Sequence, residues 1–338
     1  GMPSGHPDGL DGRDFEALRS IAPARALEAR DAAGVGAEEL DRPAILRGAT
    51  SGWRAEARWA SRRALEAHYG AMPVRVWGGD VYSGALYAKR RNAGARRPLA
   101  RYLSLHDADE RGRPAVPEAR QGSPYVFENE FSGPRSELLA DIDVPECFAS
   151  DVFEQLPALR KAMPQYRWFL CGLRGSGSAI HVDPRGTAAW NALLAGAKRW
   201  WFFPPNQSPA FREAIGAAGP GAHPEPEPPL HWWRSRQRAD GGAGLSAWGM
   251  LEAVQLPGET VFVPQGWWHQ VLNLDFTTSW SQNFVLPAML PAAFAEWRRD
   301  WPVGLRIYAH AERPPGGDSW PDLGASGDAD VTPAPRGP

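Results

Sequence analysis

The chain has 338 residues, of which 43% are hydrophobic, and a formal net charge of -2. This length predicts one large domain or a core with extensions, and the near-neutral charge gives no general attraction to nucleic acid or an anionic membrane. Two cysteines, Cys147 and Cys171, are too few for a disulfide framework or a zinc cluster. No apolar run is long enough to span a bilayer and no secretory signal is evident, so we expect an intracellular protein, cytoplasmic or nuclear, without a membrane partner.

The N-terminal third combines helical and strand patterns but carries no chemical motif. Residues 1–12 are rich in Gly and Pro and are predicted to be disordered. Residues 13–122 are predicted to form an N-terminal extension of helices and strands. Within it, apolar spacing predicts helices over about 14–30 and 61–69 and strands at 42–47 and 73–77.

A basic run follows, made of Lys89, Arg90, Arg91, Arg96, Arg97 and Arg101. Such runs are usually solvated loops, and an anion contact, for instance with RNA, is the functional alternative. Only Tyr87 and Tyr102 place aromatic rings nearby. The sequence therefore gives a nucleic-acid partner weak support.

Strand patterns dominate residues 123–286, where about eight strands match a closed or double-sheet β-structure. The fold is therefore predicted to be mainly β. A Pro/Gly-rich insertion at 206–249 interrupts these strands; a structureless loop of this length is usually functional or disordered, and we interpret it as part of a substrate rim. Helical spacing over 287–312 predicts C-terminal helices that cap the core or form a homodimer face. Residues 313–338 are predicted to be a disordered tail.

The segment His181-Val182-Asp183 gives the first chemical signal. Apolar flanks predict a strand, on which His181 and Asp183 share one face. One imidazole and one carboxylate are two of the three ligands that hold non-haem Fe(II) and leave positions open for substrate and oxygen. His269, after an apolar strand closed by Pro264, is the best third candidate. A lone His-x-Asp is more often structural, so this pattern alone leaves the metal site a hypothesis.

Lys198 gives an independent signal, because it lies in the apolar hairpin between Trp190 and Phe203. Burying an unpaired ammonium is costly. This lysine must therefore be solvated, paired or functional.

Together, these segments resemble the Jumonji-C (JmjC) oxygenases. The resemblance is carried by HVDPRGTAAWNAL (181–193), GAKRW (196–200) and PGETVFVPQGWWHQVLNL (257–274). It runs with gaps from about residue 42 to about residue 284. The most similar branch contains the bifunctional arginine demethylase and lysyl hydroxylase once called the phosphatidylserine receptor.

The resemblance implies a double-stranded β-helix, a cupin-like jelly roll with flanking helices, in which the N-terminal region extends one sheet. It implies oxidation that depends on Fe(II), 2-oxoglutarate and O₂, with His181, Asp183 and His269 as metal ligands. The far carboxylate of 2-oxoglutarate needs a cation inside the barrel, and Lys198 is the only lysine on the core strands.

Four further residues are expected to contact 2-oxoglutarate. Asn191 and Ser281 are the remaining polar candidates on the core strands. The resemblance adds Tyr125 at a position that contacts the far carboxylate. It also adds Ser178, which like Ser281 stands where the relatives carry Thr.

The resemblance implies a protein or peptide substrate, with lysine hydroxylated at carbon as the first expectation and methyl-arginine demethylation as a variant. Glu128 and Glu130 are candidates to receive a cationic side chain, with an exposed turn as the alternative. Succinate and CO₂ would be the co-products. A cupin-type metal-dependent sugar isomerase would usually use more His and Glu ligands and would not need Lys198, and a non-catalytic binding module would not need an intact triad.

Overall fold

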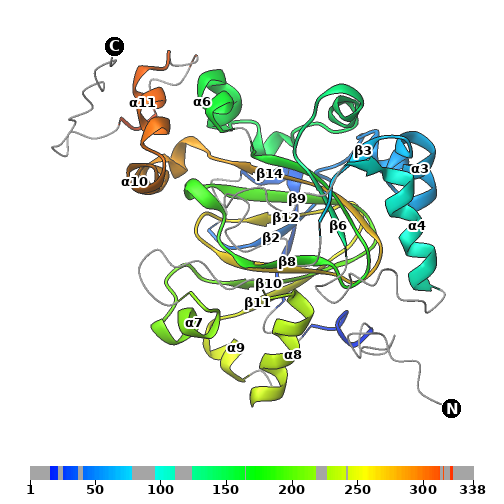
Figure 1. The fold of residues 1–338 in the computed structure, drawn as a ribbon. Coiled ribbons are helices and arrows are strands. Elements are labelled where there is room, and N and C mark those ends of the chain that lie inside the picture. The colour runs from blue at the N-terminus through cyan, green and yellow to red at the C-terminus, as the bar shows by residue number, and fades with distance from the viewer. Residues whose placement is uncertain are drawn as a thin grey trace, which may run out of the picture.

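The computed structural model describes residues 16–21, 26–36, 41–77, 96–110, 124–163, 165–217, 227–240, 243–312, 315 and 320–322. Its centre is a barrel made of two facing sheets (Figure 1). Among the described strands, all pairs except β1–β2 are antiparallel. The predicted fold, a mainly β double-stranded β-helix with flanking helices, is confirmed.

The large sheet has eight strands in the order β1-β2-β12-β9-β14-β7-β6-β4. In that order the strands are Ala29–Asp31, Ala44–Arg47, Glu259–Val263, Ala188–Ala195, Thr277–Phe284, Arg167–Gly172, Tyr125–Glu128 and Val76–Trp77. Strands from the N-terminal region therefore extend this sheet at both edges.

The small sheet has four strands in the order β11-β10-β13-β8. These strands are Leu251–Gln255, Lys198–Phe203, Trp268–Asn273 and Gly177–His181. A separate two-stranded sheet pairs β3 (Pro73–Val74) with β5 (Arg97–Pro98).

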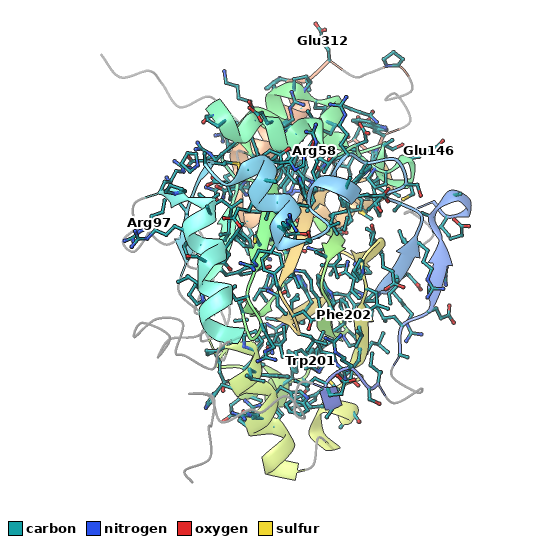
Figure 2. The ribbon with its side chains drawn as sticks, turned by 90° about the vertical axis from the view of Figure 1, so that its right-hand side faces the viewer. Arg58, Arg97, Glu146, Trp201, Phe202 and Glu312 are labelled. Atoms are coloured by element: carbon teal, nitrogen blue, oxygen red, sulfur yellow. The ribbon has the colours of Figure 1, made fainter. Side chains whose placement is uncertain are left out.

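Side-chain alternation along β10 shows how the barrel separates two cores. Trp200 and Phe202 pack inside the barrel with Val261 and Val271. Trp201 and Phe203 point to the outer cluster. This is the alternation expected for a strand buried on both faces. In Figure 2 the labelled Arg97 and Glu312 lie at the edge of the molecule and are exposed, whereas Trp201 and Phe202 lie within its outline and are fully buried.

Helices cover the outside of the barrel in three groups (Figure 1). Beside the large sheet lie α2 (Ala55–Arg58), α3 (Arg62–Tyr69), α4 (Leu99–Glu110), η6 (Gly133–Ala140) and η7 (Glu146–Phe148), with the short η2 (Ala32–Gly34) after β1. Beside the small sheet lie α7 (Pro209–Ala214), α8 (Pro229–Asp240) and α9 (Ala243–Ala247). The third group contains α5 (Val152–Gln155), α6 (Pro157–Ala162), η9 (Pro287–Met289), α10 (Leu290–Asp300) and α11 (Pro302–His310). In the described part of the chain, no helix is long and apolar enough to cross a membrane.

Two N-terminal predictions were wrong. The helix expected over about 14–30 does not run through this range: Glu16 and Ala17 are helical, but Ala26 bridges Glu252 and β1 begins at Ala29, while residues 14, 15 and 22–25 lie outside the described residues. Its apolar residues are used by tertiary packing, since Leu18 is buried in the outer cluster and such contacts override local propensity. The strand expected at 73–77 is divided at Arg75 between two sheets.

The insertion at 206–249 is also different from the structureless loop that we expected. Its described residues contain α7, α8 and α9. Trp232 of α8 and Phe211 of α7 are buried against the outer face of the small sheet. Among the described Pro and Gly residues of the insertion, Pro209 and Pro229 begin α7 and α8, and Gly216 follows α7 with a positive φ of 71°.

The C-terminal helices are present where the sequence predicted them. Their apolar residues Phe294, Trp297 and Tyr308 pack inside the chain against α5 and α6. Trp320, within the tail predicted to be disordered, is buried in this same cluster, and Pro321 accepts a hydrogen bond from Tyr308 Oη. The division of the chain into separate domains stays a prediction.

Candidate active site

The structure brings His181, Asp183 and His269 together at one end of the barrel. Their ligand atoms all lie within 4.8 Å of one another. His181 Nε2 is 4.0 Å from Asp183 Oδ1, and His269 Nε2 is 3.8 Å from Asp183 Oδ2. Such separations leave room for an ion bound at about 2 Å from each ligand.

Both imidazoles are oriented for metal binding by the backbone. His181 Nδ1 lies 2.8 Å from the Ala179 carbonyl, and His269 Nδ1 lies 3.1 Å from the Trp267 carbonyl. Because a carbonyl only accepts, each Nδ1 carries the proton and each Nε2 presents a lone pair toward Asp183. Burial, followed by the proximity of His269, lowers the pKa of His181 well below its usual range, so this imidazole stays neutral.

Asp183 lies just beyond the strand rather than within it. Strand β8 ends at His181, and Asp183 is the N-cap of the 3₁₀ turn η8 (Pro184–Gly186), with extended φ and ψ of -62° and 137°. Its Oδ2 is buried and has no hydrogen-bond partner in the described structure. Burial raises the pKa of Asp183. A buried carboxylate with one oxygen near each of two Nε2 atoms, and with no hydrogen-bond partner on Oδ2 among the described residues, fits a cation ligand.

A β-bulge in β8 turns Ser178 into the barrel. His269 pairs with His181, but Val271 pairs with Ser178, so one extra residue lies on β8 between these pairs. Directly opposed residues share a face, and Val271 packs in the barrel interior. Ser178 and His181 therefore both face inward although they are three residues apart.

Lys198 is buried deeper in the same barrel. Only 1% of its surface is exposed, and its Nζ donates a hydrogen bond of 3.2 Å to Tyr125 Oη. Burial lowers the pKa of Lys198 to about 7, and nearby Cys171 raises it slightly. Burial also raises the pKa of Tyr125. An ammonium and a phenol inside the barrel form a site that fits an anionic group.

Asn191 and Ser281 are neighbours on adjacent strands of the large sheet. They are directly paired between β9 and β14, on the face that Asn191 shares with the interior residue Ala189. Ser281 Oγ lies 3.3 Å from the Trp190 carbonyl, while Asn191 Oδ1 is buried and has no partner in the described structure. Both predicted polar residues therefore face the interior.

Two interior polar residues were not predicted. Asn273 pairs with Lys198 across β13 and β10, and its Oδ1 is buried and lacks a partner among the described residues. Alternation from His269 along β13 could have indicated Asn273. Trp168 pairs with Ser281, and its buried Nε1 also lacks a described partner. Nothing in the sequence shows that β7 pairs with β14.

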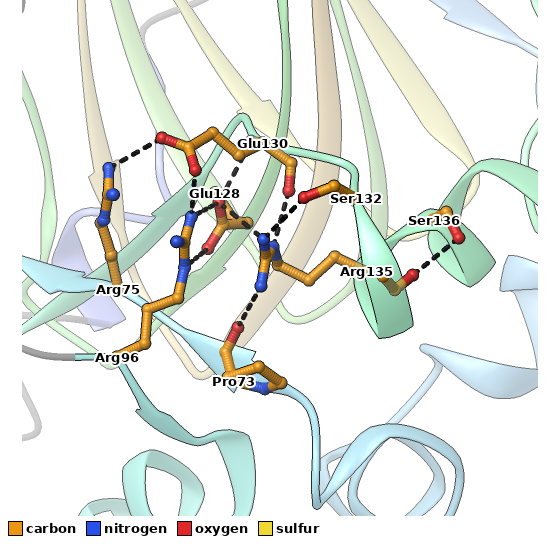
Figure 3. A network of polar contacts seen from close by, with 9 residues as sticks. Pro73, Arg75, Arg96, Glu128, Glu130, Ser132, Arg135 and Ser136 are labelled. Carbon is orange, nitrogen blue, oxygen red and sulfur yellow. Dashed lines mark hydrogen bonds and ion pairs between the residues drawn. The ribbon is translucent and has the colours of Figure 1, made fainter.

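The acidic pair Glu128 and Glu130 is already occupied by arginines (Figure 3). Arg96 Nη2 lies 3.1 Å from Glu128 and 2.7 Å from Glu130, and Arg75 lies 3.1 Å from Glu130. Val126 and Glu128 face away from the barrel interior, because Val126 packs in the outer core. The expectation that this pair receives a substrate cation, or forms an exposed turn, was wrong for the buried Glu128. Lys89, Arg90 and Arg91 of the basic run lie outside the described residues.

A double-stranded β-helix with two histidines and one aspartate converging at its end defines the class of facial-triad metal sites typical of non-haem Fe(II) oxygenases. Residues 168–284 match the family model described as JmjC domain, hydroxylase. The chain belongs to the JmjC-domain family, as its motifs indicated.

Proteins similar to this chain carry related activities in their names. The bifunctional arginine demethylase and lysyl-hydroxylase psr-1 of Caenorhabditis briggsae is 33% identical over 246 residues, covering 72% of this chain and 55% of that protein. Lysine-specific demethylase JMJ21 of Arabidopsis thaliana is 32% identical over 248 residues, covering 73% and 23%. The 2-oxoglutarate and iron-dependent oxygenase JMJD4 of Mus musculus is 32% identical over 161 residues, covering 46% and 36%. The chain thus spans about half of these relatives or less.

Proposed function

We propose that this protein is an Fe(II)- and 2-oxoglutarate-dependent oxygenase that hydroxylates a protein side chain. The observation that carries the proposal is the presence, in one barrel, of a convergent His181–Asp183–His269 triad and a buried Lys198. A metal site alone would suit many cupin-like proteins. The buried ammonium adds a place for the far carboxylate of a dicarboxylate co-substrate.

The residues divide into three roles. His181, Asp183 and His269 would hold Fe(II), which with 2-oxoglutarate and O₂ would supply the oxidising chemistry and release succinate and CO₂. Lys198 and Tyr125 would bind the far carboxylate, and Asn191, Ser281 and Ser178 would provide further polar contacts inside the barrel. Trp200 and Phe202 pack beside this space and keep it poor in water, which strengthens the contact between Lys198 and an anion.

A groove of about 610 Å³, lined by Gln265 and Trp267 shortly before His269, is our candidate site for the substrate chain. Trp267, whose carbonyl accepts from His269 Nδ1, lines it together with Met289 and Asp41. The groove is also lined by Arg42, and both Asp41 and Arg42 are exposed, so a cationic residue would be attracted to the Asp41 side of the groove. The relatives named above as lysyl hydroxylase and as lysine or arginine demethylases act on such residues. Lysine hydroxylation is therefore the first candidate reaction, and methyl-arginine demethylation the second.

The test is incubation of the protein with Fe(II), ascorbate, 2-oxoglutarate and a library of peptides containing lysine or methyl-arginine. Succinate formation together with a mass increase of about 16 Da on lysine, the mass of one oxygen atom, would support hydroxylation. Loss of a methyl group as formaldehyde would support demethylation. If no succinate forms, a second incubation of the metal-loaded protein with sugars tests the isomerase, and tight peptide binding without any turnover would favour a binding module.

Other partners have less support. The apolar residues that suggested a homodimer through the C-terminal helices are buried within the chain. A nucleic-acid contact would depend on the basic run described above. One member of this run, Arg96, already pairs with Glu128 and Glu130. Intracellular localisation, cytoplasmic or nuclear, remains a proposal supported by two cysteines that form no disulfide.

A further inference from the structure

The turn that carries Asp183 is fixed to a helix from the other end of the chain. Trp297 of α10 donates a hydrogen bond from Nε1 to the Arg185 carbonyl at 2.7 Å. Glu296, the preceding residue of the same helix, accepts a hydrogen bond from the Gly186 amide at 2.6 Å. Two consecutive side chains of α10 thus bind the carbonyl and the amide of one peptide unit of η8, the unit that joins Arg185 to Gly186.

Close packing removes the remaining freedom of this turn. Arg185 has left-handed φ and ψ of 59° and 30°, and Gly186 also has a positive φ of 59°. A Cβ added to Gly186 would lie 2.8 Å from Ala293 Cα of α10. The Arg185 guanidinium lies 4.7 Å from the centre of the Trp301 ring. A non-glycine residue keeps a left-handed conformation only when its surroundings hold it there.

The opposite side of the turn is bound to the strands that carry the rest of the site. Gln265, four residues before His269, donates from Nε2 to the Gly186 carbonyl. Thr187 Oγ1 donates to the Pro184 carbonyl at 2.9 Å and accepts from Asn283 Nδ2 at 2.8 Å. The turn is therefore held between α10 and the barrel, with Asp183 at its first position.

We propose that Glu296 and Trp297 are positioning residues for Asp183, and that α10 is part of the metal-binding apparatus. The inference rests on the proposed metal site at His181, Asp183 and His269. Asp183 follows the strand end and is the N-cap of η8, so the backbone of this turn, together with a hydrogen bond from the Asn283 side chain, sets where its carboxylate lies. Partners that orient a ligand in this way typically change metal affinity by about 10- to 100-fold when they are removed.

The experiment measures the dissociation constant for Mn(II), by electron paramagnetic resonance of the free ion, in the full chain. Glu296→Ala and Trp297→Phe each remove one hydrogen bond to η8, and Trp297→Phe keeps an aromatic ring in the apolar cluster. Trp232→Phe is the matched control for the ring, because Trp232 is equally buried and its Nε1 has no partner in the described structure. Asp300→Ala is the control for loss of a carboxylate from α10. The unfolding temperature of each metal-free protein is measured in parallel.

We expect the Mn(II) dissociation constant to rise about 10-fold or more in Glu296→Ala and Trp297→Phe and to stay near the wild-type value in both controls. Glu296→Gln should restore most of the affinity, because its amide oxygen can still accept from the Gly186 amide. A lowered unfolding temperature with unchanged Mn(II) affinity would mean that α10 only stabilises the fold, and the proposal would be wrong. If Trp297→Phe does not fold, the half-buried Glu296 and its Ala and Gln variants decide the question. Failure of the wild-type protein to bind Mn(II) would instead contradict the proposed function.

Discussion

Lys198 and Tyr125 come from different sheets of the barrel, yet the Lys198 ammonium donates directly to the Tyr125 hydroxyl at 3.2 Å. Their contact defines an anion site deep in the same interior as the metal triad. Burial lowers the pKa of Lys198. Its role in 2-oxoglutarate binding can therefore be separated from its role in folding stability by varying the pH.

Replacing Lys198 with Met should raise the 2-oxoglutarate dissociation constant more than about a hundredfold. Removing one partner of a desolvated ion pair typically costs about 3–5 kcal/mol. Metal affinity should remain, and the apo protein should be no less stable because a buried amine is removed. Lys198→Arg should also fail, since the guanidinium is planar and bulkier. Calorimetric titration of anaerobic Mn(II) protein checks this, with Lys161→Met on exposed α6 as control; an unchanged constant would remove Lys198 from the site.

Binding of 2-oxoglutarate should weaken as pH rises through about 7. In the free protein the Lys198 pKa is about 7, so above that pH the side chain is mostly neutral. The 2-oxoglutarate dianion binds the charged ammonium, and the amine must therefore take up a proton when 2-oxoglutarate binds. The dissociation constant should be flat below pH 7 and rise by up to about tenfold per unit above it. The same pH series with Lys198→Met should show no such rise.

Folding stability should depend on pH in the opposite direction. The folded pKa of Lys198 lies below its ordinary value of 10.5, so the unfolded chain binds more protons between about pH 7 and 10.5. The free energy of unfolding of the apo protein should therefore increase with pH in this window. Subtracting the stability-versus-pH curve of Lys198→Met from that of the wild type isolates the contribution of Lys198. The subtraction is needed because Tyr125 and Cys171 are titratable groups next to this lysine.

Asp183→Ala should abolish Mn(II) binding without unfolding the protein. Metal binding should be lost because Asp183 is the one acidic ligand of the triad. The fold should persist because the buried Oδ2 has no partner in the described structure, so removing the carboxylate relieves a desolvation cost. Mn(II) should raise the unfolding temperature of the wild-type protein and leave that of Asp183→Ala unchanged. Asp143→Ala, which removes an exposed carboxylate, should respond to Mn(II) like the wild type; stabilisation of both variants alike would place the ion elsewhere.

The triad was accessible from sequence because its chemistry is written in local patterns. A His and an Asp two residues apart, a later His after a strand, and a lysine among aromatic residues need no knowledge of pairing. Asp183 shows the limit of this approach, because it lies in a turn and reaches the site through extended φ and ψ rather than through strand alternation.

Features that depend on long-range pairing were not predictable. Ser178 faces inward only because of a bulge opposite His269 and Val271. The hydrogen bonds from α10 to η8 join residues more than 100 positions apart. The N-terminal segment has helical spacing, but Ala26 and β1 gain more from pairing with strands of the core.

Asp41→Asn should raise the Michaelis constant for a cationic peptide without changing peptide-independent 2-oxoglutarate turnover. Asp41 lines the groove beside Trp267 and is exposed, and an exposed ion pair contributes about 0.2–1 kcal/mol, so an increase of about two- to fivefold is expected. The effect should shrink at high salt. Asp143→Asn, outside the groove, is the control. An equal Michaelis constant in wild type and Asp41→Asn would exclude this groove edge as a subsite.

Gly172→Ala tests whether the anion site depends on close packing behind Tyr125. Gly172 of β7 pairs with Tyr125, and an added Cβ would lie 2.9 Å from Tyr125 Cε2 and 2.8 Å from Ser176 Oγ, and would collide with the Asn273 amide nitrogen. Asn273 faces Lys198 on the adjacent strand. The methyl group must therefore displace either Tyr125 or Asn273 at the site where Lys198 is held.

We expect Gly172→Ala to lower the free energy of unfolding by about 1–3 kcal/mol, as is usual for overpacking, and to weaken 2-oxoglutarate binding while Mn(II) binding persists. Gly34→Ala is the control, because a Cβ there meets nothing within 4 Å. Adding Asn273→Ala to Gly172→Ala removes the worst collision and should recover part of the stability, since contacting residues are not additive. If stability falls but the 2-oxoglutarate dissociation constant does not move, Tyr125 and Asn273 serve packing alone, and Lys198 would have to bind the carboxylate without them.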